Sequence, residues 1–378
     1  MKNSKILFAF SLIIIVITGC ISCNEKGKKN NNEEIKIGAI FDLTGSLSYM
    51  GKWSQDGAMQ AVENINKNGG IDGRIVKLIF EDGGSDANKC VSAVRKLIDN
   101  DKVSLIIGFS SSSSVMASAP IANSDKVVIL ATATGSPNIT DAGDYIFRNR
   151  LSGKLEVEAI SKFIAVDRNQ KDIGVIYINN DYGNGYAKIF HSSFESHGGK
   201  ILLEEGFEQD QTDFKTLVKK FKDNNIKNIY LVAFAKEGGN LLKQCFEQNY
   251  MPQWYCANPI EAPEFLKIAG AATEGVIYSV ARYDPNDSLS MKFNSEYKAK
   301  HGYDSEMFAA NTYDAVNIGA MAIAKTDGSG EKIKTFLYDS VQNYPGAAGL
   351  TSFDNNGDIL KPVMMKTIKD GKFITLEK

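Results

Sequence analysis

Short apolar segments alternate with amphipathic helical patterns along most of this chain, and no other feature restricts the possible folds as strongly. Each apolar segment has the length of one strand, and the pattern after it repeats its apolar residues at helical spacing. Strands that alternate with helices in this way form a parallel sheet with helices on both faces. The first round of expected elements comprises Ile35–Phe41, Asp56–Lys67, Arg74–Glu81, Asp86–Asp99, Val103–Gly108, a helix opened by the serine run 110–114, and Val127–Ala131.

The pattern begins again after Arg148 and predicts a second α/β half. Its expected elements are Leu155–Val166, Ile173–Ile178, Tyr186–Ser196, Lys200–Phe207, Phe214–Asn224, Asn228–Ala233, Glu237–Gln248 and Gly275–Val280. The remainder should contain a helical stretch, a loop and two short strands, at Leu289–Ser340, Gly346–Asp358, Val363–Ile368 and Phe373–Leu376. Two such halves predict two lobes with a cleft between them, where ligands bind beyond the carboxyl ends of the strands.

The first residues have the features of an export signal. Lys2 and Lys5 precede an apolar run, Ile6–Thr18, of about 13 residues, which is shorter than the roughly 20 that a membrane-spanning helix needs. Ile17-Thr18-Gly19-Cys20 then resembles a bacterial lipobox, in which the cysteine is acylated and becomes the new N-terminus. We therefore predict a signal peptide over residues 1–19 and a lipid on Cys20. The alternatives are an ordinary signal peptide with a chance cysteine, or acylation at Cys23, whose surroundings fit the motif less well.

Residues 20–34 offer no apolar face to bury, so we expect a flexible tether that ends near Ile35. One acyl chain holds a protein only marginally, and lipoproteins of this kind carry more than one. These features predict an exported protein that is anchored to the cell membrane by lipid and faces the periplasm or the cell exterior.

Charge and cysteine content exclude some classes of protein. The formal charge is −2 and falls to −4 when Lys2 and Lys5 leave with the signal, so no basic excess suggests a nucleic-acid partner. The roughly 340 residues that remain suffice for two domains of ordinary size. No later segment is long and apolar enough to span a membrane. Cys90, Cys245 and Cys256 are expected to be buried thiols, and a disulfide between Cys245 and Cys256 stays open.

Several short motifs occur in a specific order along the chain. They are Ile37-Gly38-Ala39, Leu43-Thr44-Gly45, Gly51, the run Gly57–Asn66, Gly69-Gly70-Ile71-Asp72-Gly73, Glu81-Asp82, Ile107-Gly108 with its serines, Ala133-Thr134, Asp181-Tyr182-Gly183, Asp213-Phe214, Thr312-Tyr313-Asp314-Ala315 and Phe353-Asp354. In this order they resemble the type I periplasmic binding proteins of the branched-chain amino acid (Leu/Ile/Val-binding) family. The resemblance covers nearly all of the mature chain, and its first block is the most specific.

The resemblance implies two Rossmann-like lobes joined by three crossings, near Leu151, Ala281 and Phe353. Residues 35–151 and 281–352 would form lobe 1, and residues 152–280 and 353–378 would form lobe 2. It also implies a monomeric extracytoplasmic receptor of an ABC importer, which closes on a free amino acid, branched-chain or related, and delivers it to a membrane permease. Two alternatives on the same fold are a ligand-sensing receptor and a binder of an amide or a short organic acid.

The run Ser110–Ser114 follows a strand and opens a helix, where free backbone N–H groups and hydroxyl donors favour a carboxylate. The resemblance gives Ser112 the role of holding the ligand carboxylate. It places Thr132 and Thr134, after the next strand, where a backbone carbonyl and a threonine bind the ligand's ammonium and carboxylate. The following Gly135-Ser136-Pro137 has one residue more than the commonest family spacing.

The resemblance also predicts apolar walls for the cleft. Tyr182 and Phe234 would cover the ligand from lobe 2, and Met50, with Tyr49 beside it, would face it from lobe 1. Aromatic walls exclude water and suit an apolar or mixed side chain. Trp53 could replace Met50 in this role or could only pack against its neighbours.

Asn258 departs from the family pattern. Relatives that bind aliphatic amino acids carry a glutamate at this position, which pairs with the ligand ammonium, whereas asparagine has no charge. Glu261 could substitute if its loop bends inward, but an exposed Glu261 is the simpler expectation. The sequence therefore leaves open which amino acid or analogue is bound.

A secreted α/β enzyme is the competing class, and we expect a binding protein instead. The sequence contains neither a Gly-x-Gly-x-x-Gly after a strand nor a Gly-x-Ser-x-Gly elbow. His191 and His197 are spaced poorly for a shared metal ion, and His301 stands apart from both. We therefore expect no catalytic residue, no cofactor and no metal.

Overall fold

A computed structural model describes residues 34–282, 284 and 286–376 of the chain. Cys20 and the expected signal peptide, with the tether up to residue 33, lie outside the described residues. Within the described part, no helix combines the length and the apolar character needed to cross a membrane.

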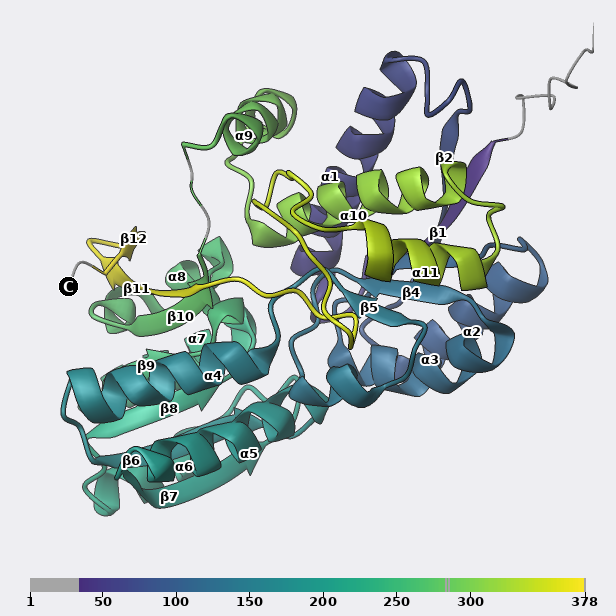
Figure 1. Cartoon of the computed structure of the whole chain (residues 1–378). Coiled ribbons are helices and arrows are strands. Elements are labelled where there is room, and N and C mark those ends of the chain that lie inside the picture. Colours follow the sequence, from purple (N-terminus) through teal and green to yellow (C-terminus); the bar gives the residue numbers. More distant parts are fainter. Residues whose placement is uncertain (1–33, 283, 285, 377–378) are drawn as a thin grey trace, which may run out of the picture.

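Lobe 1 is built on a parallel sheet of five strands in the order β2-β1-β3-β4-β5 (Figure 1). The side chains of β1 point alternately to the two faces of the sheet. Ile37 and Ala39 pack with α1, α10 and α11 on one face, and Ile40 packs with α2 and α3 on the other. Its elements are β1 (Ile35–Phe41), α1 (Ser48–Lys67), β2 (Val76–Asp82), α2 (Ala87–Asp99), β3 (Leu105–Gly108), α3 (Ser112–Asp125), β4 (Val128–Ala131), β5 (Ile146–Arg148), α10 (Met307–Ala324) and α11 (Gly330–Ser340).

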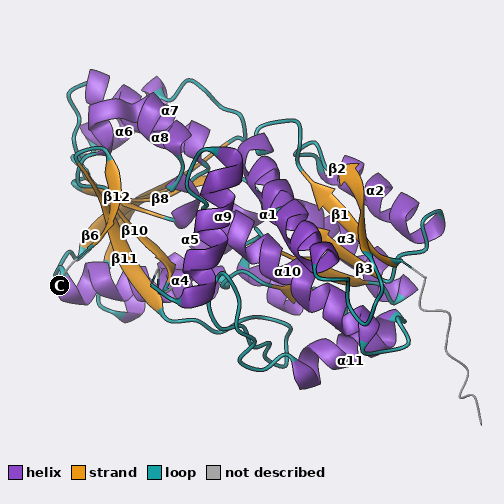
Figure 2. Ribbon diagram, turned by 90° about the horizontal axis from the view of Figure 1, so that it is seen from above, coloured by secondary structure: helices purple, strands orange, loops and turns teal. Residues whose placement is uncertain are grey.

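Lobe 2 has a sheet in the order β12-β11-β10-β9-β8-β6-β7, in which only β11 and β12 run antiparallel to their neighbours. Helices α6, α7 and α8 lie on one side of this sheet, and α4 and α5 on the other (Figure 2). Its elements are α4 (Gly153–Lys162), β6 (Asp172–Ile178), α5 (Asp181–Ser196), β7 (Lys200–Phe207), α6 (Lys215–Asp223), β8 (Asn228–Val232), α7 (Ala235–Glu247), β9 (Gln253–Cys256), α8 (Pro263–Ala269), β10 (Ile277–Ala281), β11 (Val363–Lys369) and β12 (Lys372–Thr375).

The two lobes are joined by three crossings, after β5, after β10 and before β11 (Figure 1). We expected the third near Phe353, but Phe353 and Ile359 pack in the core of lobe 1 and pair with each other. The Phe353 ring meets the ring of Phe147 edge-on, with centroids 5.3 Å apart, which keeps this segment on lobe 1. The chain therefore passes to lobe 2 between Ile359 and Val363.

Most expected strands and helices lie close to their predicted bounds, and the differences have local causes. Helix α1 begins at Ser48, earlier than expected, because Gly51 lets it approach β1: a Cβ there would lie 2.0 Å from the Asp42 carbonyl oxygen. The expected helical stretch from Leu289 is three helices: α9 (Ser288–His301) ends at Gly302 in a left-handed conformation, and α10 and α11 follow. The short strands β5 and β9 were not predicted. Cys90, Cys245 and Cys256 are all buried free thiols.

A buried carboxylate attaches the loop before the third crossing to α10. Asp314 is fully buried, and its two oxygens accept hydrogen bonds from the backbone N–H groups of Ala347 (2.7 Å) and Ala348 (2.8 Å). Burial raises the pKa of Asp314 to about 7, against the effect of these two donors. The folded protein therefore holds a proton at Asp314 at pH values where the unfolded chain has released it.

We predict that Asp314 makes the protein less stable as pH rises. Its contribution is complete below the unfolded pKa of 3.8 and is lost as pH approaches 7. Between pH 5 and pH 7 the wild type should lose roughly 2 kcal/mol more of its free energy of unfolding than an Asp314→Asn variant. Urea titrations across this range measure the difference. An Asp339→Asn variant, at an exposed site, should keep the wild-type dependence; identical slopes for all three proteins would contradict the assignment.

Candidate ligand-binding cleft

The two lobes meet at the carboxyl ends of their parallel strands. The Ser136 hydroxyl donates to the Asp181 carbonyl oxygen (2.8 Å), and the Gln209 side chain donates to the Ser46 hydroxyl (3.2 Å). Leu47, Met50 and Ala133 of lobe 1 also belong to one apolar cluster with the core of lobe 2. The structure is therefore a closed arrangement of the lobes.

A small cavity remains at the centre of this contact. Its volume is about 10 Å³, which is about the space of a single water molecule. An amino acid cannot enter a space of this size, so the lobes must separate to admit any ligand. The cavity is lined by Ser110, Ser112, Ala133, Gly135, Arg150, Tyr182, Phe234 and Pro259.

Helix α3 points its N-terminus at this cavity. Its N-cap, Ser111, makes no side-chain hydrogen bond to the helix, and Ser112 at the first helical position lines the cavity. The Ser112 hydroxyl accepts a bond from the backbone N–H of Ser136 (3.2 Å) and keeps a proton to donate. The helix N-terminus and this hydroxyl together provide a place for an anionic group.

Two further buried hydroxyls have no partner among the described residues: that of Tyr182, which lines the cavity, and that of Thr134, which does not. The oxygens of Thr134 and Tyr182 are buried without a hydrogen bond, and these residues are only 1% and 3% exposed. A buried polar group without a partner is costly, and such groups are rare in folded proteins. A ligand that bonded to these hydroxyls would remove the cost.

Close packing at the start of α5 positions Tyr182. The Asn180 side chain accepts from the Gly183 backbone N–H (3.0 Å) and so caps the helix. A Cβ on Gly183 would lie 1.8 Å from the Ile178 carbonyl oxygen, so only glycine lets α5 start this close to β6. The Tyr182 ring stacks on Phe234 with centroids 5.3 Å apart. The two aromatic residues expected from lobe 2 thus form one wall of the cavity.

The structure does not place Thr132 at the cavity. Its hydroxyl bonds to the Gly108 carbonyl oxygen (3.4 Å) and to the Thr312 hydroxyl (3.0 Å). Its own carbonyl oxygen accepts from the Asn311 side chain (3.3 Å). Thr132 therefore attaches β4 to α10 inside lobe 1, and the ligand contact that we expected from it is wrong for this arrangement of the lobes.

Tyr49, Met50 and Trp53 contribute to the contact between lobes. Met50 is fully buried against lobe 2, and the Tyr49 hydroxyl approaches the backbone N–H of Ala235 at the start of α7. Trp53 packs edge-on against Tyr49 (5.2 Å) and stacks on Phe308 (6.4 Å). None of these three residues lines the central cavity.

Asn258 belongs to a buried polar cluster centred on Arg150. The Arg150 Nη2 donates to Asn258 Oδ1 (2.7 Å) and to Glu156 Oε2 (3.0 Å), and its Nη1 donates to the Tyr186 hydroxyl (3.1 Å). Asn258 Nδ2 and the Tyr186 hydroxyl both donate to Glu156 in turn. Burial disfavours the charged forms of both Arg150 and Glu156, and it raises the pKa of Glu156. The negative charge of Glu156 nevertheless raises the pKa of Arg150 above its usual value.

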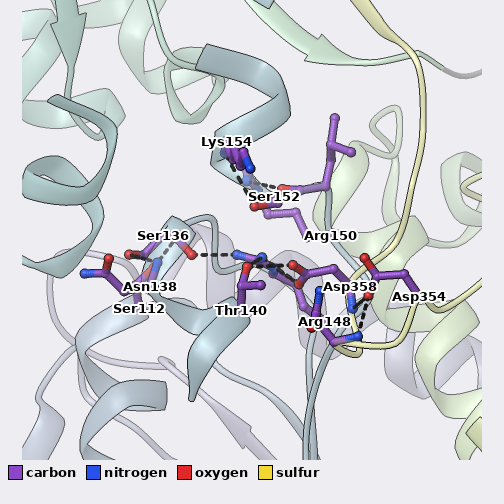
Figure 3. A network of polar contacts seen from close by, with 12 residues as sticks. Ser112, Ser136, Asn138, Thr140, Arg148, Arg150, Ser152, Lys154, Asp354 and Asp358 are labelled. Atoms are coloured by element: carbon purple, nitrogen blue, oxygen red, sulfur yellow. Dashed lines mark hydrogen bonds and ion pairs between the residues drawn. The ribbon is translucent and has the colours of Figure 1, made fainter. Parts of the chain in front are cut away.

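A second buried arginine lies two residues away and bonds to the other side of the junction (Figure 3). Arg148 donates to Asp358 Oδ1 from Nε (2.9 Å) and from Nη2 (2.6 Å), and to the Ser136 carbonyl oxygen from Nη1 (2.6 Å). Asp358 also accepts from the Thr140 hydroxyl (2.7 Å). The Arg148–Asp358 pair attaches the first crossing to the segment before the third crossing. Ser136 bonds to Arg148 and to Ser112, and so connects this pair to Ser112.

A larger cavity, of about 120 Å³, lies beside the crossings. Glu261 lines it and pairs with Lys366, so Glu261 faces the hinge and does not replace the missing charge at Asn258. Each crossing contributes to its wall, through Leu151, Ala281, Arg282, Ile359 and Lys361.

The sequence analysis missed Arg150, Glu156 and Tyr186 as members of the site. Arg150 and Glu156 are almost fully buried, at 2% and 1% exposure, although charged residues are seldom buried without a partner. The sequence signal that could have pointed to this buried cluster is Arg148-Asn149-Arg150, which stands at the end of an apolar strand. Among the described residues, no cluster of three or more histidine, cysteine or acidic side chains is arranged to hold a metal ion.

Comparison with known proteins agrees with this fold. The chain belongs to the periplasmic binding protein family, whose family model matches residues 34–372. A leucine-, isoleucine-, valine-, threonine- and alanine-binding protein of Pseudomonas aeruginosa is 28% identical over 329 residues, which cover 86% of this chain and 87% of that protein.

Two solved structures show the likeness in three dimensions. A leucine-binding protein from Thermotoga maritima superimposes with a TM-score of 0.85 at 26% identity and covers 91% of this chain and 98% of its own. A branched-chain amino acid transporter substrate-binding protein from Streptococcus pneumoniae, in complex with isoleucine, gives 0.84 at 26% identity and covers 92% and 100%. The two-lobed type I architecture expected from the sequence is thereby confirmed, and the similar proteins are binding proteins.

We predict that the Arg148–Asp358 pair is essential for stability. Changing Asp358 to Asn leaves a fully buried guanidinium without its counter-charge, which should cost about 3–5 kcal/mol. Chemical denaturation of the two proteins measures the loss. Asp304→Asn, which breaks an exposed pair with Lys298, should change stability by less than about 1 kcal/mol. A similar small effect from both changes would show that the buried pair is not needed.

Proposed function

We propose that this protein is an extracytoplasmic receptor of an ABC importer that closes its two lobes on a free amino acid, branched-chain or related. The observation that carries the proposal is the convergence of the α3 N-terminus, the Ser112 hydroxyl and the unpartnered Tyr182 hydroxyl on one cavity between the lobes. A carboxylate suits the helix N-terminus, and the Tyr182–Phe234 wall suits an apolar body. The ligands named for the similar proteins support this choice.

Binding and closure would be one equilibrium. The lobes can rotate about three crossings, and a ligand that contacts both lobes favours the closed arrangement by the difference in its contacts. Ser112 acts from lobe 1, and Tyr182 and Phe234 act from lobe 2. The closed pair of lobes would then present a surface to a membrane permease, and one copy of the chain suffices for this cycle.

A short organic acid is the second candidate ligand. It is favoured by the Arg150 cluster, because Asn258 brings no charge to the cleft and its amide oxygen is already taken by Arg150. Such a ligand would use the same carboxylate site at α3.

We predict that the full chain, purified in mild detergent, binds one or more free amino acids in calorimetric titrations. Ser112→Ala and Thr134→Ala should each weaken binding about tenfold, since each removes one hydrogen bond of roughly 1–1.5 kcal/mol, and should leave the fold intact. Ser295→Ala, on the exposed side of α9, is the matched control and should bind as the wild type does. If no amino acid releases heat on binding or raises the melting temperature, the amino acid assignment fails.

We further propose that Cys20 carries the lipid anchor, so that the receptor stays close to its permease. Cys20→Ser should move the protein from the membrane fraction to the soluble extracytoplasmic fraction and should abolish its labelling by a radioactive fatty acid. Cys23→Ser should change neither. Retention of the label in the Cys20→Ser variant would point to Cys23 instead.

A further inference from the structure

The charge in the wall of the central cavity is opposite to what a ligand ammonium needs. Of the eight residues that line the cavity, Arg150 carries a positive charge and none carries a carboxylate. The polar lining otherwise consists of the hydroxyls of Ser110, Ser112 and Tyr182. The hydroxyls of Ser112 and Tyr182 can donate hydrogen bonds to an oxygen atom of a ligand, whereas the Ser110 hydroxyl donates to Asp42. None of them neutralises a cation.

The carboxylate nearest to the cavity has its oxygens occupied. Glu156 Oε1 accepts from Asn258 Nδ2 (2.9 Å) and from Arg150 Nη2 (3.3 Å), and Oε2 accepts from Arg150 Nη2 (3.0 Å) and from the Tyr186 hydroxyl (2.7 Å). The Asn258 amide oxygen accepts one bond from Arg150 (2.7 Å) and keeps one lone pair. The guanidinium therefore takes up most of the acceptors that an ammonium group could have used.

The cluster does not attract a ligand ammonium in either state of Glu156. An ionised Glu156 is paired with Arg150, so the cluster is neutral and has no carboxylate oxygen free for a further cation. A protonated Glu156 would leave the guanidinium as an unbalanced positive charge. Two like charges at short range in a buried site cost several kcal/mol.

Two other buried carboxylates, Asp42 and Glu237, lie outside the cavity lining, and each keeps one oxygen without a hydrogen bond among the described residues. Asp42 receives hydrogen bonds from Ser85 and Ser110 and does not line the cavity. Glu237 accepts from the Asp210 backbone N–H (3.0 Å) at the start of α7 and is also absent from the lining.

We propose that Arg150 determines specificity, so that the cleft binds a carboxylate with an apolar body more tightly when the ligand carries no ammonium group. This inference rests on the proposed function of the cleft and names its substrate class: small apolar monocarboxylates, with 2-oxo and 2-hydroxy acids preferred to the amino acids of the same skeleton. A 2-oxo or 2-hydroxy oxygen can accept a bond from the Tyr182 hydroxyl, which lines the cavity and lacks a partner. An ammonium at that position brings only donors and a charge of the wrong sign.

The direct test compares ligands with one skeleton and different groups at the second carbon. The full chain, in mild detergent, is titrated with leucine, 4-methyl-2-oxopentanoate, 2-hydroxy-4-methylpentanoate and 4-methylpentanoate at pH 7. We expect the oxo or the hydroxy acid to bind at least tenfold more tightly than leucine. Leucine binding as tightly as both, or more tightly, overturns the inference and leaves the proposed receptor function standing. If none of the four binds, and no other amino or organic acid does, the cleft is not the ligand site and both proposals fail.

Variants then assign the preference to Arg150. Arg150→Ala frees Glu156 and Asn258 to accept bonds from an ammonium, so the affinity ratio of oxo acid to leucine should fall at least tenfold. In the double variant Arg150→Ala, Glu156→Gln, which leaves no unpaired buried charge, the two ligands should bind within about threefold of each other. A wild-type ratio in the double variant overturns the role of Arg150 even if the single variant fails to fold. Arg95→Ala, which removes an exposed pair with Asp125, is the control and should keep the wild-type ratio.

Discussion

Two buried arginines meet where the chain first leaves lobe 1, and the geometry of the cleft depends on them. Arg148 is bound by Asp358 and Ser136, which fixes the first crossing against the segment before the third. Arg150 is bound by Glu156, Asn258 and Tyr186, all in lobe 2. A buried charge that loses its partner is strongly destabilising, so neither crossing can shift far while its pair is intact. The contacts of the two arginines therefore fix the ends of the hinge, and the lobes can rotate only about the residues between those ends.

The sequence was sufficient for the architecture because periodicity reports burial directly. The strand β1 can be predicted from its short apolar run, because both of its faces are buried, with Ile37 and Ala39 on one face and Ile40 on the other. The third crossing was not readable in this way. Phe353 stays on lobe 1 because its ring packs on Phe147, and a contact between residues so distant in sequence leaves no local pattern.

The site was predictable only where a residue follows a strand or opens a helix. Ser112 and Tyr182 satisfy that condition, and both line the cavity. Thr132 also follows a strand, but its hydroxyl bonds to Thr312 of α10. Because α10 lies far along the chain, the sequence around Thr132 does not show to which side of the strand end its side chain points. The asparagine at position 258 predicted that the negative charge of the family glutamate is missing from this position. It could not show that Asn258 instead bonds to Arg150 and Glu156, because those contacts form only when three segments of the chain fold together.

The described chain starts beside β1, in the sheet of lobe 1, and its last strands lie at the outer edge of lobe 2. Any attachment made through the residues that precede Glu34 would therefore be made to lobe 1, beside β1. Lobe 2 would then be joined to that attachment only through the three crossings, so every change in its position relative to lobe 1 would arise at the hinge.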